Sequence, residues 1–206
     1  QLEDVALDVV EVPAHAGGGV ELRSPRVFLD PTVVARVQAR HPDALGVLTY
    51  LVNRMQRRDG RGNLTPYSMV CALGPLQSNP SAPPPATWPA WVGTLTAETI
   101  LINPWLAEDQ AYEPGTQVEL ELAYFVMEQG RDLRETTRLF RIGNVTPLDG
   151  LAADRTLMPD FPELPEGDKF SDWQPGFELK YPIRPERDDQ YWERYRGTPK
   201  AFIALE

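Results

Sequence analysis

The sequence predicts an α+β fold, with mixed or antiparallel sheets and short helices, in two small lobes joined by a proline-rich connection. Apolar and polar residues alternate over 116–127, which is typical of a half-buried strand. The 206 residues include 21 prolines, about twice the average share, and these disfavour long helices. Six prolines fall within 74–92, a stretch without periodicity. We therefore expect a first lobe over 1–92, which ends with this connection, and a second lobe over 93–206.

In the first lobe, two β-branched segments, 4–12 and 20–23, predict strands on either side of a glycine-rich turn. A helix should begin after Asp30, whose side chain can cap the first turn, because Pro31 suits the first helical position. This helix should end at about His41, next to a proline.

A hairpin is predicted from 45–57 and 65–73, because the glycine-containing turn 59–63 separates two apolar runs. Four arginines at its tip are the densest basic cluster in a chain of net charge −10: Arg54, Arg57, Arg58 and Arg61. We interpret them as a solvated tip, since a nucleic-acid binder needs a concentrated basic face. Neither nucleic acid nor an anionic membrane surface is an expected partner.

The second lobe should contain a buried strand that leads into Asn103 as a helix cap and Pro104 as the first helical residue. A second hairpin is predicted from 116–127 and 133–145. The tail over 148–186 is rich in proline and aspartate, which indicates irregular, ordered coil.

Two elements are expected at the end of the chain. Residues 187–196 should form a short helix that Gly197 stops, because glycine accepts the left-handed conformation that follows many helices. Residues 200–205 should form a final strand.

The sequence offers no recognisable catalytic constellation. The two histidines, His15 and His41, lie in the glycine-rich turn and at a helix end. Cys71, the single cysteine, lies in an apolar run, where it should be inert core, and one cysteine excludes an internal disulfide. These three residues are too far apart for a zinc site. We predict no enzyme, and we assign no catalytic, cofactor-binding or metal-binding residue.

Two groups of carboxylates have alternative interpretations. Glu119 and Glu121 could act as an acid–base pair, but we expect them to pair with Arg134 and Arg138 of the returning strand. Seven acidic residues crowd the tail, where they could hold calcium or form a solvated acidic loop: Asp149, Asp154, Asp160, Glu163, Glu166, Asp168 and Asp172.

Trp88 and Trp91, in the proline-rich connection, are the candidate partner-contact residues. They could form an aromatic platform for a sugar or a peptide, with Trp173 as a third ring. Alternatively, they could pin the connection onto the core, because buried aromatic rings contribute a large apolar area.

Two segments in the middle of the chain are familiar when read together. Ile100–Asp109, followed by Pro114–Leu120, resembles the helix-then-hairpin unit of FtsX/MacB-type ABC-transporter permeases. Gly115-Thr116 stands where that family usually has Gly-Asp, a mild departure.

The tail carries the stronger resemblance. Ala153–Pro162 and Tyr191–Phe202 look like signatures of one subgroup of these permeases. Thr65–Val70 is similar to a strand of the same subgroup. Together the matching segments extend over most of the chain, and the unlike stretches, 13–20 and 74–92, fall in predicted loops.

The resemblance implies the extracytoplasmic, MacB-like periplasmic domain of a four-helix permease subunit in a bacterial membrane, whose partner is a cytoplasmic ATPase subunit. Such a domain relays ATP-driven motion or contacts an external protein, lipid or substrate, without catalysis or a cofactor. No stretch here approaches the roughly 20 apolar residues that cross a bilayer. We therefore expect the anchoring spans in sequence that flanks Gln1 and Glu206.

Two other functions remain open from the residues alone. One is a secreted carbohydrate- or peptide-binding module that uses the tryptophans. The other is a hydrolase with an unrecognised site, which the lack of a nucleophile–base pair disfavours.

Overall fold

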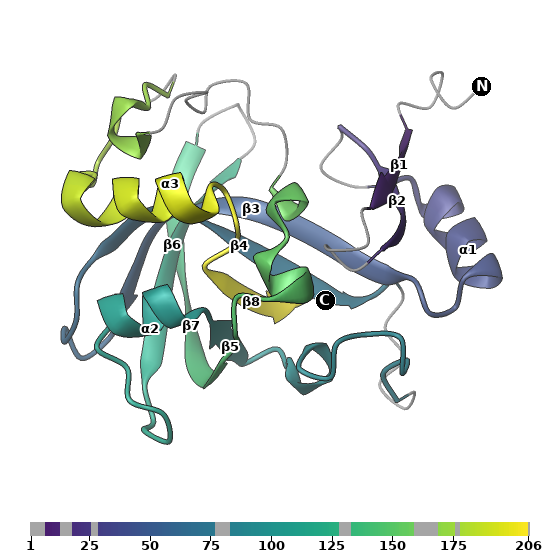
Figure 1. Ribbon diagram of the computed structural model, residues 1–206, viewed down its shortest axis with the longest axis horizontal. Coiled ribbons are helices and arrows are strands. Elements are labelled where there is room, and N and C mark those ends of the chain that lie inside the picture. Colours follow the sequence, from purple (N-terminus) through teal and green to yellow (C-terminus); the bar gives the residue numbers. More distant parts are fainter. Residues whose placement is uncertain are drawn as a thin grey trace.

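The computed structural model describes residues 7–12, 18–25, 29–76, 83–127, 133–158, 169–175 and 178–205. Six strands close into a mixed barrel in the order β3-β4-β8-β5-β7-β6, and two further strands, β1 and β2, form a small separate sheet. Short helices pack around the barrel (Figure 1). The predicted α+β class is confirmed.

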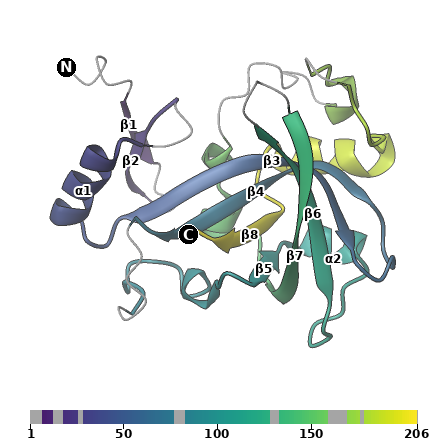
Figure 2. The same cartoon turned by 180° about the vertical axis from the view of Figure 1, so that it is seen from behind.

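The N-terminal unit consists of the antiparallel strands β1 (Asp8–Val12) and β2 (Gly19–Arg23) and the helix α1 (Pro31–Arg40). The side chain of Asp30 accepts a hydrogen bond from Thr32 N at 2.8 Å, so the predicted cap is confirmed. Figures 1 and 2 show this unit at one end of the molecule, on the opposite side from α2 and α3.

The predicted first hairpin is present as β3 (Leu45–Arg57) and β4 (Thr65–Pro75). In its turn, Gly62 has φ +80°, and a side chain there would lie 2.6 Å from the carbonyl oxygen of Gln110. Glycine is therefore required by both conformation and close packing.

One part of the solvated-tip interpretation is wrong. Arg57 is only 8% exposed, and its guanidinium donates hydrogen bonds to the Ala111 carbonyl at 2.8 Å and to the Asp59 carboxylate at 2.6 Å. It fastens the hairpin tip to the end of α2, because five fixed donors suit a site with several oxygen acceptors.

The second half of the barrel begins with β5 (Thr99–Ile102) and the short helix α2 (Pro104–Asp109). Asn103 caps α2 as predicted, since its side-chain oxygen accepts a hydrogen bond from Leu106 N at 2.8 Å. The second hairpin is also present, as β6 (Glu119–Met127) and β7 (Leu133–Val145).

The predicted pairing of Glu119 and Glu121 with the returning strand is wrong. Strand β6 also pairs with β3, and the cations come from this side: Glu121 forms an ion pair with Arg54 of β3, and Glu119 accepts at 2.9 Å from Arg58, which directly follows β3. Barrel closure brings the two strands together, and the local hairpin pattern carries no information about that closure.

The remainder of the chain contains short helical turns and a last strand. They are the 3-10 helices η3 (Val92–Thr94), η4 (Gly150–Ala153), η5 (Arg155–Leu157) and η6 (Phe170–Asp172), the π-helical turn η7 (Pro185–Asp189), α3 (Gln190–Tyr195) and β8 (Ala201–Ala204). The predicted C-terminal helix and strand are confirmed, with the helix beginning two residues earlier as a π-helical turn. Strand β8 lies parallel to β4 and antiparallel to β5.

Alternate residues of β4 enter two different apolar clusters. Val70 and Ala72 join the cluster inside the barrel, whereas Cys71 and Leu73 join a cluster that includes Phe202 on the outer face. This is the two-residue period of a strand that is covered on both sides. A third cluster, on the part of the outer face that α3 covers, gathers aromatic side chains: Tyr67, Phe170, Trp173 and Trp192.

The barrel takes β3 and β4 from residues 1–92 and the other four strands from residues 93–206. The predicted lobe boundary at residue 92 therefore lies between strands of one sheet. No helix in the described part of the chain is both long and apolar enough to cross a membrane.

Candidate functional site

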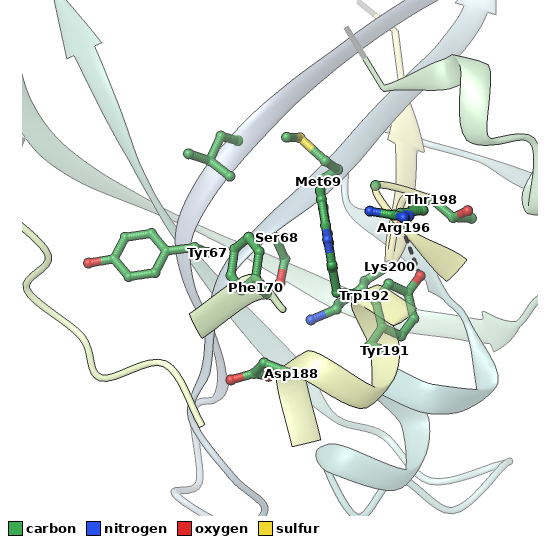
Figure 3. Close-up of a pocket in the computed structure, with 12 residues that line it drawn as sticks. Tyr67, Ser68, Met69, Phe170, Asp188, Tyr191, Trp192, Arg196, Thr198 and Lys200 are labelled. Carbon is green, nitrogen blue, oxygen red and sulfur yellow. Dashed lines mark hydrogen bonds between the residues drawn. The ribbon is translucent and has the colours of Figure 1, made fainter. Parts of the chain in front are cut away.

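A small pocket lies between β4 and the C-terminal segment, and unusual residues gather around it (Figure 3). Its walls come from β3, β4, η6, η7, α3 and the segment 196–200, and its volume is about 30 Å³ for the centres of water-sized groups. A single water molecule needs roughly 10–15 Å³ by this measure. The pocket therefore accommodates about two atoms of the size of oxygen.

Lys200 is the most unusual side chain in this wall. It is only 5% exposed, and Nζ lies 4.1 Å from the ring centre of Trp105 and 4.7 Å from that of Tyr191. Burial lowers the pKa of Lys200 to about 8, although the nearby Asp188 carboxylate acts in the opposite direction. The aromatic faces stabilise the ammonium group electrostatically, but they accept no conventional hydrogen bond.

The main chain fixes Lys200 between two strands. Its N–H donates to the Met69 carbonyl at 2.9 Å, and its own carbonyl accepts from Asn103 N at 2.9 Å. The backbone on both sides of Lys200 is therefore held before β8 begins, and the side chain has little freedom to leave the pocket wall.

Tyr191 forms the second aromatic wall. Its hydroxyl donates to the Thr198 carbonyl at 2.9 Å and accepts from the Asn103 side-chain amide at 2.9 Å. Burial strongly raises the pKa of Tyr191, so this phenol is neutral at physiological pH. The ring is locked in position, which is what a preformed wall requires.

A buried ion-pair network lies beside the pocket. Arg184 donates to the Asp109 carboxylate at 3.0 Å and to the Asp188 carboxylate at 2.7 Å, and these two carboxylates are almost fully buried. Burial alone would raise the pKa of Asp109, but hydrogen bonds from Arg184, Thr65 and Asn63 together lower it below its usual value. Asp109 therefore remains charged and joins α2, the first hairpin and η7.

Two of the residues that line the pocket have strained backbones. Tyr67 has φ +23° and Arg196 has φ +52°, a region that L-residues with side chains seldom adopt. Such strain costs of order 1–3 kcal/mol at each residue and gathers at functional sites. The third described non-glycine residue of this kind, Ala111, lies at the end of α2.

The prediction that Gly197 stops the last helix at the C′ position is confirmed, since α3 ends at Tyr195 and Arg196 is its C-cap. The positive φ at this helix end belongs to Arg196 (+52°) and not to Gly197. Gly197 has a different reason to be glycine. A Cβ atom there would lie 1.6 Å from the sulfur of Met158, so any larger residue at this position requires the Met158 side chain to move.

The predicted contact residues Trp88 and Trp91 lie far from this pocket in the chain and pack against the second apolar cluster. Trp91 stacks at a tilt on Phe202 with ring centres 4.9 Å apart, and Trp88 Nε1 donates to the Asp43 carbonyl at 2.6 Å. Both rings are half-buried. Trp173 is only 3% exposed, in the third cluster.

The other candidates from the sequence do not converge on a site. Cys71 is fully buried, and burial raises the pKa of its thiol to about 12, so the prediction of an inert thiol is confirmed. His41 ends α1, and His15 lies outside the described residues. In the described part of the chain, no three His, Cys, Asp or Glu side chains are grouped to hold a metal. Four of the seven acidic tail residues, Asp160, Glu163, Glu166 and Asp168, lie outside that part.

The sequence reasoning missed Lys200 and the Asp109–Arg184–Asp188 network. Lys200 had one visible signal, since it directly precedes the apolar run of the last strand. Within the network, Arg184 and Asp188 have the i,i+4 spacing of a helical ion pair, whereas Asp109 comes from a distant segment and had no signal. No protein-family model and no curated protein matches this chain.

Proposed function

We propose that this chain is the extracytoplasmic, non-catalytic domain of an ABC-transporter permease subunit, which relays ATP-driven motion or contacts an external partner. The observation that carries the proposal is a convergence in space. Three of the permease-like segments, Thr65–Val70, Ile100–Asp109 and Tyr191–Phe202, are far apart in the sequence and form one connected unit.

The contacts between these segments are direct. Thr65 Oγ1 donates to Asp109 at 2.5 Å, Asn103 donates to the Tyr191 hydroxyl at 2.9 Å, and Lys200 N donates to Met69 at 2.9 Å. Segments that resembled a family by chance would be expected at scattered places on the surface, without contacts to one another. Segments whose residues hold one another in place are consistent with a domain whose shape is its function.

The barrel also suits transmission of force. Strands from both predicted lobes share backbone hydrogen bonds, as in the pairing of Val70 with Ala201. A displacement applied on either side of the proline-rich connection would therefore pass through the sheet. Within this proposal the two lobes, 1–92 and 93–206, would move as one body, and the connection would not act as a hinge.

The alternative, a secreted carbohydrate- or peptide-binding module, depends on Trp88 and Trp91. Both indole rings are used in packing against the second apolar cluster, which leaves less of each face for a ligand. We therefore rank this alternative below the permease domain. A ligand whose binding is lost in both Trp88→Ala and Trp91→Ala would reverse that order.

Cysteine labelling of the intact gene product in cells tests the topology. Cys71, the single cysteine of these 206 residues, is fully buried and should give no background, and any cysteine in the flanking sequence is replaced first. We expect Val20→Cys, at a position that is 71% exposed, to react with a membrane-impermeant maleimide added outside the cytoplasmic membrane. Val70→Cys is the matched control, since Val70 is fully buried and should stay unlabelled.

Three results would contradict the proposal, the last of them in part. Labelling of Val20→Cys only after the cytoplasmic membrane is lysed would place the domain on the wrong side. Failure of an ATPase subunit to copurify with the intact product would contradict the assignment to an ABC transporter. Substrate turnover by the purified chain would overturn the non-catalytic assignment alone.

A further inference from the structure

The pocket beside Lys200 has the properties of a binding site, and these are independent of the proposed permease function. Lys200 Nζ lies against two aromatic rings, and among the residues that the structure describes none accepts a hydrogen bond from it. Figure 3 draws a hydrogen bond from Tyr191 to Thr198 and none from Lys200. A buried ammonium group without an acceptor is costly, and a ligand with acceptor oxygens would remove that cost.

The charge around the pocket favours an anion. Among the described residues, three charged side chains line the pocket: Lys200, Arg196 and the buried Asp188. Arg184 and Arg187 lie outside this lining, where Arg184 pairs with Asp109 and Asp188 and Arg187 pairs with Asp109. Both carboxylates already accept hydrogen bonds from Arg184. The exposed Glu108, which pairs with Arg187, is the remaining acidic group of this cluster. Because the Asp188 carboxylate accepts from the Arg184 guanidinium, the positive charges of Lys200 and Arg196 exceed the negative charge that faces the pocket.

The size of the pocket narrows the class of anion. The pocket is small, about 30 Å³ for the centres of water-sized groups, which matches the two oxygens of a carboxylate. The walls provided by Phe170, Trp192 and Met69 are apolar, which suits the carbon that carries a carboxylate. The two strained residues, Tyr67 and Arg196, shape this same wall.

We propose that the pocket binds a single carboxylate group, with Lys200 Nζ as its main hydrogen-bond donor. The carboxylate has two sources that share this chemistry: a small free acid or the C-terminal carboxylate of a peptide.

Lysine NMR tests this proposal sharply, because the chain contains only three lysines: Lys169, Lys180 and Lys200. With ¹³Cε-labelled lysine, we expect added sodium acetate to shift the Lys200 signal in a saturable manner and to raise its pKa by about 1 or more. Lys180 is the matched control, since its side chain is 63% exposed and pairs with Glu135. Its signal should follow ionic strength only.

The variants assign the effect to the pocket. Lys200→Met should abolish saturable acetate binding, measured by shifts of backbone amides around Thr198, whereas Lys180→Met should retain it. If Lys200→Met does not fold, the acetate titration of the Lys200 signal in the unchanged protein still tests whether the pocket binds a carboxylate. A Lys200 response to sodium chloride equal to the acetate response would overturn the proposal, and so would no saturable response at all.

Two peptides distinguish the sources. Acetyl-Ala-Ala with a free C-terminus and the same peptide as an amide differ only in the carboxylate. Binding of the free peptide at least tenfold tighter than acetate supports a chain terminus as the ligand. Binding of acetate with exclusion of both peptides supports a free acid. Equal binding of the acid and amide peptides would contradict a carboxylate site.

Discussion

The barrel and the N-terminal unit contain similar apolar residues but bury them very differently. Val70 in the barrel is fully buried, whereas Val20 and Val9 in the small sheet are 71% and 58% exposed. Helix α1 contains no buried residue, and in the described chain before Leu45 the buried hydrophobic residue is Leu7. Turns and caps are thus sufficient to define an element, but burial decides where the free energy of folding resides.

The sharpest test of this contrast is truncation of one leucine in each region. Leu120→Ala removes a fully buried side chain from the barrel interior and should lower the free energy of unfolding by about 3–4 kcal/mol. Leu22→Ala, at a half-buried position of β2, should cost less than half as much. Urea unfolding followed by circular dichroism measures both. An equal loss of unfolding free energy in the two variants would mean that the N-terminal unit is part of the same core.

The second test concerns charge. Arg184→Met leaves Asp109 and Asp188 buried without their shared partner and should cost about 3 kcal/mol. Arg58→Met removes an exposed ion pair with Glu119 and should cost less than about 1 kcal/mol. Both variants carry the same chemical change, and thermal unfolding at one pH measures the loss of stability of each. A harmless Arg184→Met would show that the network does not join the tail to the barrel.

The third test uses pH. In the unfolded chain Lys200 should keep its proton to about pH 10.4, whereas in the folded chain the pKa is about 8. The unfolded state therefore binds more protons between these values, so folding stability rises with pH. Relative to Lys200→Met, the unchanged protein should gain up to roughly 3 kcal/mol between pH 7 and 10. Cys71 and Tyr191 titrate in both proteins and cancel in this difference.

If the difference in stability between the unchanged protein and Lys200→Met does not change over that pH range, the burial of the lysine charge is contradicted.

The smallest effects come from replacing a methyl group by a hydroxyl at two valines. Val70→Thr places a hydroxyl inside the barrel and should cost about 1–3 kcal/mol, whereas Val20→Thr should stay within about 0.5 kcal/mol. Guanidinium midpoints of the two variants provide the comparison. An equally damaging Val20→Thr would show that this exposed face is covered in solution.

Much of this architecture follows from local pattern. The alternation over 116–127, the Asp30 and Asn103 caps and the glycine-containing turn 59–63 all correspond to elements of the structure. Each is decided by residues within a few positions of one another.

The parts that sequence reasoning missed depend on distant partners. The parallel pairing of β4 with β8 closes the barrel, and no local period indicates it. The burial of Arg57 depends on carbonyl groups at the end of α2, and that of Lys200 depends on the Trp105 and Tyr191 rings. These arginine and lysine side chains resemble solvated residues until the fold supplies acceptors and aromatic faces.

The position of β8 has a consequence for how the protein acquires its structure. This strand is the last one in the described part of the chain, yet it lies between β4 and β5 in the sheet, and Val70 must meet Ala201. The chain between β4 and β8 must lose conformational entropy before the contacts between these strands form, and this slows folding. During synthesis, the edges of β4 and β5 would wait unpaired until residues 201–204 leave the ribosome, and this interval is when the chain is most exposed to aggregation.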